Sequence, residues 1–193
     1  MSGTLFYLIG ASGSGKDSLL AGCRARLRPE QHCCVAHRYI TRAPGVGGEN
    51  HVHLSAEEFQ MRDQFGLFAM QWQSHGYRYG IGSEINGWLD RGLNVLVNGS
   101  REYLPQALVQ YDELVPVLID VDPDLLRNRL LSRGREGAIE IEQRLARHQQ
   151  LVNNLNSDLD SNLIKVDNSG DLMHGINALL EVIKHHSWLG VSN

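Results

Sequence analysis

Hydrophobic residues along the chain fall into short continuous runs and longer amphipathic stretches that alternate with one another. The continuous runs predict buried strands at residues 4–9, 33–40, 94–97, 114–121 and 162–166, with a weaker candidate at 68–72. The amphipathic stretches predict helices at residues 16–27, 55–65, 84–91, 101–111, 123–133, 140–155 and 172–186. Strands that alternate with helices in this way predict an α/β fold, with a parallel sheet flanked by helices on both faces.

Two stretches interrupt the alternation, at residues 41–79 and 132–139. A chain of 193 residues has the length of one domain, so we expect both stretches to be inserts of a single domain, placed over an active site. Within the first stretch, Ser55 is followed three residues later by Glu58, which predicts a capping box at the start of a helix.

The composition narrows the class of protein. Apolar residues make up 42% of the chain, enough for one sizeable core, and the formal net charge of -4 does not favour nucleic acid as a partner. The three cysteines, Cys23, Cys33 and Cys34, have no disulfide or zinc spacing, which favours reduced thiols. The first apolar run is too short for a signal peptide or a membrane span. We therefore expect a cytoplasmic protein without membrane segments.

A glycine-rich segment joins the first predicted strand to the first predicted helix. Its residues are Gly10, Ala11, Ser12, Gly13, Ser14, Gly15 and Lys16, the G-x-x-x-x-G-K pattern of a P-loop. Glycines let backbone N–H groups approach phosphate oxygens, the helix start adds its positive end, and Lys16 supplies a cation for the β- and γ-phosphates. The segment predicts a phosphoryl-transfer protein that binds ATP through residues 10–18.

The position after the P-loop lysine departs from the pattern, which places a magnesium-binding serine or threonine there. Asp17 takes that position and Ser18 follows. Because Mg²⁺ prefers one or two carboxylates together with water and phosphate oxygens, Asp17 is the predicted Mg²⁺ ligand. An alternative is that Asp17 only complements the helix dipole while Ser18 reaches the metal.

Arginines gather around the second irregular stretch. Arg133 and Arg135 flank Gly134, and Arg144 lies on the next predicted helix. Planar guanidinium groups match the charge on the equatorial oxygens of a transferring phosphoryl group, and a loop between two helices can close over a site. With Lys16, these three arginines are the predicted catalytic cations, although a solvated basic face is the alternative reading.

A second polar cluster suits an anionic, hydroxylated ligand. Arg38 and Arg42 precede a Pro/Gly-rich turn, His51 follows it, and Tyr79 comes after a group of further histidine, tyrosine and arginine side chains. Histidines 51 and 53 lack a third ligand at a familiar spacing, which argues against a metal site of their own.

The order of these segments resembles the guanylate kinase branch of the nucleoside-monophosphate kinases over nearly the whole chain. The matching pieces are Gly10–Lys16, Thr41-Arg42-x-Pro44, Gly48-Glu49, Ser55-x-x-Glu58-Phe59, Tyr79-Gly80, and Arg129-Leu130-x-x-Arg133-Gly134-Arg135 with Arg144. The resemblance implies one P-loop kinase domain over residues 1–193, with a substrate-binding insert at about 38–92 and an arginine-bearing lid at about 132–145.

The chain departs from that family where guanine is held. The serine, glutamate and hydroxyl residue that hold the base correspond here to Arg38, Met70 and Ile81. Methionine cannot accept the hydrogen bonds that a carboxylate accepts from guanine, and losing such partners costs several orders of magnitude in discrimination. Guanine is therefore not the expected ligand.

A narrower resemblance accounts for these departures. Gly15-Lys16-Asp17-Ser18, Arg38-Tyr39-Ile40-Thr41-Arg42, Gly47-Gly48-Glu49-x-His51, Tyr79-Gly80-Ile81 and Val97-Asn98-Gly99-Ser100-Arg101 are similar to the ribose 1,5-bisphosphate phosphokinases of phosphonate catabolism. That family's reaction converts ATP and ribose 1,5-bisphosphate to ADP and 5-phosphoribosyl 1-diphosphate (PRPP). The resemblance implies a phosphorylated sugar as substrate, held by Arg38, Arg42, His51, Tyr79 and Arg101. The alternatives are a guanylate kinase with an altered pocket and a non-catalytic binding module on the same scaffold.

Overall fold

The central element of the fold is a five-stranded parallel sheet. The structure is a computed structural model that describes residues 2–45, 49–134, 137–158 and 163–189. The strands lie in the order β2 (Cys33–Val35), β7 (Asn94–Asn98), β1 (Leu5–Ile9), β8 (Leu114–Asp120) and β9 (Ile164–Asp167). All four strand pairs are parallel, so the carboxyl ends of the strands meet at one edge. This edge is where ligands bind in open α/β sheets.

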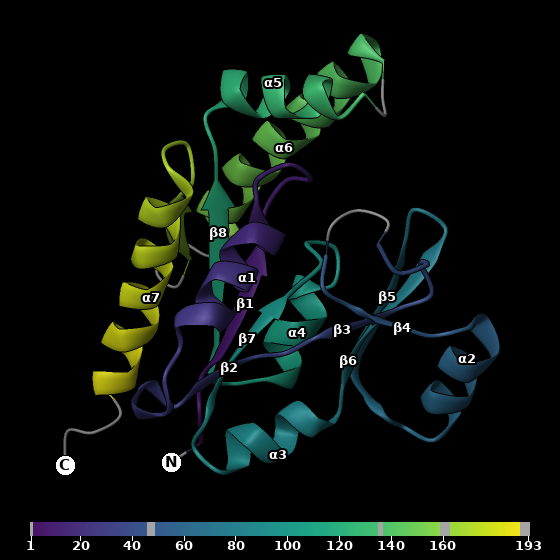
Figure 1. Cartoon of the computed structure of the whole chain (residues 1–193), viewed down its shortest axis with the longest axis vertical. Helices are drawn as coiled ribbons and strands as arrows, with labels where there is room; N and C mark the ends of the chain where they lie inside the picture. The colour runs from purple at the N-terminus through teal and green to yellow at the C-terminus, as the bar shows by residue number, and fades with distance from the viewer. Residues whose placement is uncertain (1, 46–48, 135–136, 159–162, 190–193) are drawn as a thin grey trace.

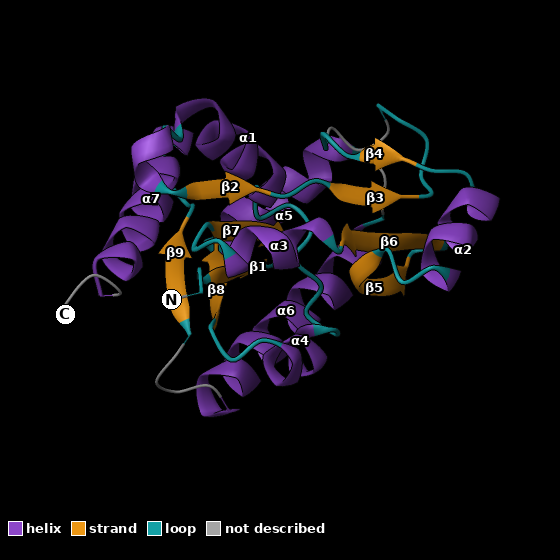
Figure 2. Ribbon diagram, turned by 90° about the horizontal axis from the view of Figure 1, so that it is seen from below, coloured by secondary structure: helices purple, strands orange, loops and turns teal. Residues whose placement is uncertain are grey.

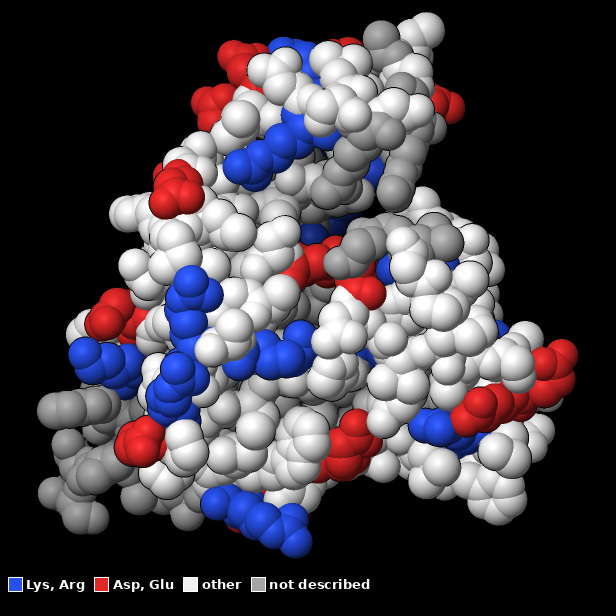
Figure 3. Space-filling view, in the orientation of Figure 1, with Lys and Arg blue, Asp and Glu red and all other residues white. Residues whose placement is uncertain are grey.

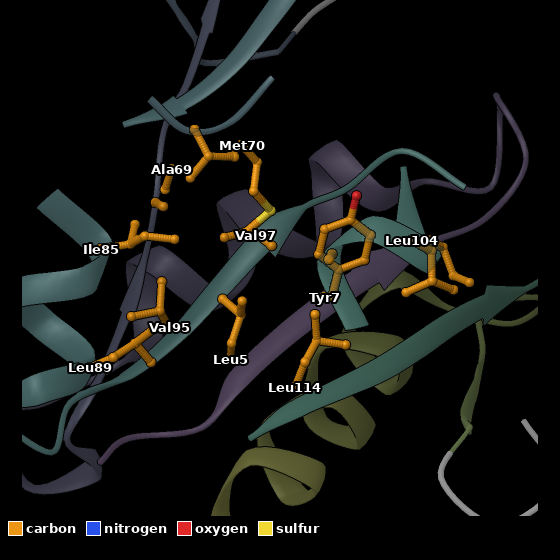
Figure 4. Packing of buried hydrophobic residues seen from close by; sticks show 14 of the residues in the cluster. Leu5, Tyr7, Ala69, Met70, Ile85, Leu89, Val95, Val97, Leu104 and Leu114 are labelled. Atoms are coloured by element: carbon orange, nitrogen blue, oxygen red, sulfur yellow. The ribbon is translucent and has the colours of Figure 1, made fainter. Parts of the chain in front are cut away.

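Helices cover both faces of this sheet because its strands are apolar on both sides. Phe6 and Leu8 of β1 pack with α1 (Lys16–Arg26) and α7 (Leu172–Leu189). Leu5 and Tyr7 point to the opposite face, where α3 (Glu84–Asp90) and α4 (Leu104–Gln110) lie. Figure 4 shows the second cluster, with side chains from β1, β7 and α3 packed together.

A second sheet projects from the central one. Its strands lie in the order β4 (Val52–His53), β3 (Arg38–Ile40), β6 (Tyr77–Gly82) and β5 (Phe68–Ser74), and α2 (Ala56–Gln64) lies beside it (Figure 1). The buried side chains Met70 and Ile81 belong to the same cluster as Val95 and Val97 of the central sheet. The two sheets therefore share one apolar core.

Two helices stand above the carboxyl edge of the central sheet. Asp122 caps α5 (Pro123–Arg133) by accepting from two backbone N–H groups, and α6 (Ala138–Asp158) returns alongside it (Figure 1). The Arg127 guanidinium joins the two helices, since it donates to both carboxylate oxygens of Glu142 at 2.7 and 3.1 Å. Ala11, Leu126 and Ile141 form a small apolar cluster beneath the hairpin.

The structure corrects three of the predicted elements. The single strand expected at 33–40 is two strands in different sheets, β2 and β3, which lie almost end to end (Figure 2). Strand β6 lies between the candidate strand at 68–72 and the helix at 84–91, where no element was expected. The helix expected from residue 101 begins at Leu104, after a turn, because Pro105 favours the first helical turn.

Smaller differences occur at the helix ends. A 3-10 turn, Pro29–Gln31, follows α1. At α2 the Ser55 hydroxyl accepts from the Glu58 N–H as predicted, but the Glu58 carboxylate pairs with Arg62 one turn later. Among the described residues, none of the helices has the length and apolar character needed to cross a membrane.

Candidate active site

A cleft of about 490 Å³ opens at the carboxyl edge of the central sheet. Its walls come from the P-loop and the start of α1, the second sheet, the loop after β7, and α6. Figure 3 shows the hollow between the α5–α6 hairpin and the second sheet, where acidic and basic side chains meet. Among the residues expected to hold ATP, Ala11 and Ser14 lie behind the cleft wall, and the others line it: Gly10, Ser12, Gly13, Gly15, Lys16, Asp17 and Ser18.

The P-loop backbone adopts conformations that glycine allows. Gly13 and Gly15 have φ angles of 94° and 88°, in the left-handed region. A Cβ on Gly15 would lie 2.4 Å from Nδ2 of Asn168, and this amide donates to the Ser14 carbonyl at 2.7 Å. Asn168, just beyond β9, therefore fixes the shape of the loop from below.

The Lys16 ammonium group is folded back onto the P-loop. It donates to the carbonyl oxygens of Gly10 and Ala11, at 2.8 and 3.0 Å. Burial lowers the pKa of the ammonium group to about 8, and the nearby Asp17 carboxylate only partly opposes this effect. Phosphate oxygens would replace the two carbonyls as better partners for this cation.

The Asp17 carboxylate is fixed from the neighbouring strand. Nδ2 of Asn98, at the end of β7, donates to Oδ1 of Asp17 at 2.7 Å, and Nη2 of Arg38 lies 4.0 Å from the same oxygen. The Asn98 Oδ1 atom is buried and has no partner among the described residues. Asp17 lines the cleft with 40% of its side chain exposed, so it remains open to a ligand.

Two arginines share one carboxylate on the opposite wall. Arg38 makes a bidentate contact with Glu49, at 2.5 and 2.6 Å, and Nη2 of Arg42 donates to the same carboxylate at 3.1 Å. All three residues line the cleft. The group carries a net positive charge in a partly buried place, which suits an anionic ligand.

An aromatic stack supports Arg38. Its guanidinium carbon lies 5.1 Å from the centre of the Tyr79 ring, and Tyr79 stacks on Trp72 at a centroid distance of 5.7 Å. Tyr79 is buried but still forms part of the cleft wall. The cation–π contact and the Glu49 pair together fix the direction of the guanidinium group.

The loop that carries Arg101 is attached to the core through a buried tyrosine. The Tyr7 hydroxyl donates to the Ser100 carbonyl and accepts from the Ser100 N–H, both at 2.9 Å. A Cβ at Gly99 would lie 2.1 Å from the Tyr7 ring, so only glycine fits there. Arg101 follows directly and lines the cleft.

The three positions matched to guanine-holding residues form a row across the second sheet. Arg38 pairs with Ile81, and Ile81 pairs with Met70. Met70 is 1% exposed and Ile81 is fully buried. The row therefore presents one guanidinium and two core side chains, and it contains no acceptor for a guanine N–H.

His51 was expected to hold substrate, but its ring contacts the backbone. Nε2 lies 2.9 Å from the Arg42 carbonyl oxygen and Nδ1 lies 3.1 Å from the Glu49 carbonyl oxygen. A neutral imidazole has one N–H, so the ring donates to one of these two carbonyls at a time. His51 is not among the residues that line the cleft. His53 also reaches the Arg42 carbonyl, at 3.0 Å.

The arginines around the lid divide into different roles. Arg144 of α6 lines the cleft. Arg127 joins α5 to α6, and Arg129 donates to the Asn168 carbonyl at 3.1 Å. Arg135 and the side chain of Arg133 lie outside the part of the chain that the structure describes.

Several lining residues were not selected from the sequence. Trp72 and Ser74 of β5 and Glu102 in the loop after β7 are among them, whereas His75, which also lines the cleft, belongs to the polar group noted before Tyr79. His75 and Gly76 form the tight turn between β5 and β6, with positive φ angles of 51° and 78°. The sequence indicated that this polar group suits an anionic ligand, but without a predicted β6 it did not show that a hairpin carries it.

Relatives of known name match the chain over most of its length. It is 53% identical over 179 residues to the ribose 1,5-bisphosphate phosphokinase PhnN of Desulfomicrobium baculatum, which covers 93% of each protein. Proteins of the same name are 46% identical in Enterobacter lignolyticus, over 96% of this chain and 94% of the relative, and 47% identical in Yersinia pestis, over 93% and 90%. The chain belongs to the PhnN phosphokinase family.

The fold of this PhnN family member also has a solved counterpart. The guanylate kinase of Anaplasma phagocytophilum matches 96% of the chain with a TM-score of 0.64, covers 87% of its own length, and is 16% identical in sequence. This likeness shows a guanylate-kinase-like fold. A comparison with protein-family models gave no match.

Proposed function

We propose that the protein transfers the γ-phosphoryl group of ATP to the 1-phosphate of ribose 1,5-bisphosphate and so produces ADP and PRPP. Its relatives at 46–53% identity bear the name of that activity. The P-loop, Lys16 and Arg144 meet Arg38, Arg42 and Arg101 in one cleft, which is the arrangement that a reaction between two phosphorylated molecules needs.

The row of Arg38, Ile81 and Met70 is the observation that carries the choice of acceptor. In a guanylate kinase this row would read a base, but here two members belong to the hydrophobic core. Arg38 and Arg42 line the same wall, and their guanidinium groups recognise phosphate rather than a purine. An acceptor with two phosphates and no base fits this wall.

The transfer needs charge neutralisation more than proton transfer. An oxygen of the acceptor 1-phosphate forms a bond to the γ-phosphorus while the bond to the β–γ bridging oxygen breaks, and ADP leaves with that electron pair. The attacking oxygen is already anionic, so no general base is required. Lys16 and Arg144, with Arg133 and Arg135 as further candidates, offset the charge on the transferring group. Arg38, Arg42, Tyr79 and Arg101 hold the acceptor.

The cleft fits a magnesium ion bound together with ATP. No group of three histidine, cysteine or acidic side chains suited to a metal occurs among the described residues, so the ion would depend on phosphate oxygens and water. Asp17 would supply the carboxylate, oriented by the Asn98 amide. When bound, Mg²⁺ would neutralise charge on the β- and γ-phosphates. Dependence on ATP and three free cysteines favour action in the cytoplasm.

His51 has a supporting part in this proposal. Its contacts with the carbonyls of Arg42 and Glu49 hold the turn that carries both residues. It therefore contributes to the acceptor site through the backbone of its neighbours.

An assay of ADP release with several acceptors tests the proposal. Ribose 1,5-bisphosphate should be turned over far faster than GMP or ribose 5-phosphate, and PRPP should be recovered as the product. A GMP rate equal to or above that of the bisphosphate would favour a guanylate kinase instead. If no acceptor increased ADP release above the ATPase background, the protein would be a binding module.

A further inference from the structure

Glu49 is an acidic residue in a site built for anions. Its side chain is 8% exposed, and both carboxylate oxygens accept hydrogen bonds from arginine. The sequence offered no role for it beyond its place in a Gly-Glu pair. A carboxylate in this position would repel a phosphate, so its presence beside Arg38 and Arg42 calls for a physical reason.

The electrostatics show what the carboxylate does for its neighbours. Burial raises the pKa of Glu49, but the hydrogen bond and charge of Arg38 and the charge of Arg42 outweigh burial and leave the pKa below its usual value. Glu49 therefore stays ionised near neutral pH. In return, it offsets the repulsion between two guanidinium groups that are only 13% and 17% exposed.

Two roles are compatible with such a contact. In the first, the carboxylate stands in for the substrate phosphate and is displaced when the substrate binds. In the second, it remains in place and orients the arginines. The geometry favours the second role, because the contact with Arg38 is bidentate and Arg42 donates to the same carboxylate.

Donors remain for a ligand while Glu49 stays in place. The Nε atom of Arg42 is buried and has no acceptor among the described residues. Arg38 uses Nε and Nη2 on Glu49, and its face rests on Tyr79. The other guanidinium N–H groups are therefore held in a defined direction at the cleft wall.

We propose that Glu49 is a positioning residue for the acceptor: it holds Arg38 and Arg42 as a preformed fork for a phosphate of the substrate. The inference rests on the proposed function, since it assigns that phosphate to the sugar bisphosphate. Glu49 acts through the arginines and does not itself bind the acceptor.

The kinetic test compares Glu49→Gln with a matched variant. Glutamine keeps the shape but removes the charge, so the acceptor KM should rise by about tenfold or more while the KM for ATP changes by less than about twofold. Glu49→Asp keeps the charge on a shorter side chain and should lie between glutamine and the wild type. Glu58→Gln is the control, because Glu58 holds Arg62 on α2, away from the cleft, and both constants should stay near the wild type.

The KM readout separates positioning from a loss of folded protein. Partial unfolding lowers apparent kcat at constant KM, whereas misplaced arginines raise the acceptor KM. A double variant adds a second check: Glu49→Gln should raise KM by a smaller factor in an Arg38→Ala background than in the wild type. An unchanged acceptor KM in Glu49→Gln would overturn the proposal, and a lowered KM would identify the carboxylate as a competitor of the substrate.

Calorimetry with inorganic pyrophosphate keeps this inference distinct from the choice of substrate. In protein saturated with ADP, pyrophosphate probes the arginine fork without a sugar, and Glu49→Gln should weaken its binding about as much as it raises the acceptor KM. If the wild type failed to use ribose 1,5-bisphosphate but Glu49→Gln still bound pyrophosphate more weakly than the wild type, the proposed function would fail and the role of Glu49 would stand. Equal pyrophosphate affinity in Glu49→Gln and wild type would contradict the role of Glu49.

Discussion

At the scale of single residues, the charge of Lys16 in the ligand-free site depends on pH. Its ammonium group is paired with two carbonyls and has a pKa of about 8. Phosphate oxygens stabilise the charged form, so binding of ATP raises this pKa again. Binding of ATP should therefore be accompanied by proton uptake at any pH at which Lys16 of the free enzyme is partly neutral.

This linkage predicts weaker ATP binding in alkaline solution. Below pH 8 the free lysine is charged, and affinity should change little with pH. Above pH 8 the ammonium form becomes scarce, so the Kd for ATP should rise by up to about tenfold per pH unit. Titration calorimetry between pH 7 and pH 9 measures this. A flat wild-type profile would contradict the linkage.

Lys16→Ala should bind ATP weakly at every pH and lose about 10²–10³ in turnover with an unchanged melting curve.

The Asp17 carboxylate, held by the Asn98 amide, predicts how magnesium dependence responds to mutation. Asp17→Asn should raise the Mg²⁺ concentration needed for half-maximal activity several-fold, because the only P-loop carboxylate is lost. Ser18→Ala should change it little. Calorimetric titration of Mg²⁺ into the protein–ADP complex provides a readout without turnover. An unchanged requirement in Asp17→Asn, or a larger effect in Ser18→Ala, would assign the metal contact elsewhere.

Some of these residues could be predicted from the sequence and others could not. The P-loop was evident because its spacing alone defines a backbone shape. The contact of Asp17 with Asn98 joins residues 81 positions apart, and the sharing of Glu49 between two arginines depends on the fold of the turn. His51 shows the opposite case: its residue type suggested a substrate ligand, while its ring is engaged by backbone carbonyls.

At the scale of elements, the strands of the central sheet were predictable, whereas in the second sheet only β5 was expected as a strand of its own. Central strands are buried on both faces, so they form continuous apolar runs. Strand β4 consists of two exposed residues, and β6 mixes tyrosine, arginine and glycine, so neither carries a period. The run at 33–40 hides a change of sheet because no glycine or proline separates β2 from β3.

The lid hairpin predicts a division between Arg144 and the other arginines. Arg144 lines the cleft from α6, and in the proposed mechanism its contacts with the transferring group would form mainly on closure of the hairpin. Arg144→Ala should therefore lower kcat by about 10²-fold, with a smaller change in the acceptor KM. Arg91→Ala, at the end of α3 and away from the cleft, is the matched charge control and should behave as the wild type. Steady-state kinetics decides, and an effect on KM alone would place Arg144 in ground-state binding.

At the scale of the whole molecule, the second sheet and the central sheet share one core. Met70 packs in the same cluster as Val95, Val97 and Ile85 (Figure 4), and Ile81 belongs to this cluster as well. A domain with one continuous core unfolds as a unit. We therefore expect calorimetry and denaturant titration to give a single transition.

This shared core predicts that Met70→Glu does not restore a guanine site. A carboxylate in that apolar cluster has no partner, so the variant should lose on the order of 3–5 kcal/mol of stability at pH 7. Part of the loss should disappear at pH 5, where the buried carboxyl group is protonated. Met61→Glu, on α2 with half of its surface exposed, should change stability by less than about 0.5 kcal/mol. Urea titration tests both variants, and a stable Met70→Glu protein that phosphorylates GMP would contradict the prediction.

The row formed by Arg38, Ile81 and Met70 also limits how this protein can evolve. Recovering base recognition would require polar groups at two positions that now complete the core, and loss of an arginine that now pairs with Glu49. Each single step lowers stability or unpairs a buried carboxylate before any new ligand can compensate. Descendants of this chain are therefore more free to vary among sugar phosphates than to acquire nucleotide acceptors, and a mutant library should yield guanine recognition only where the neighbours of Met70 change with it.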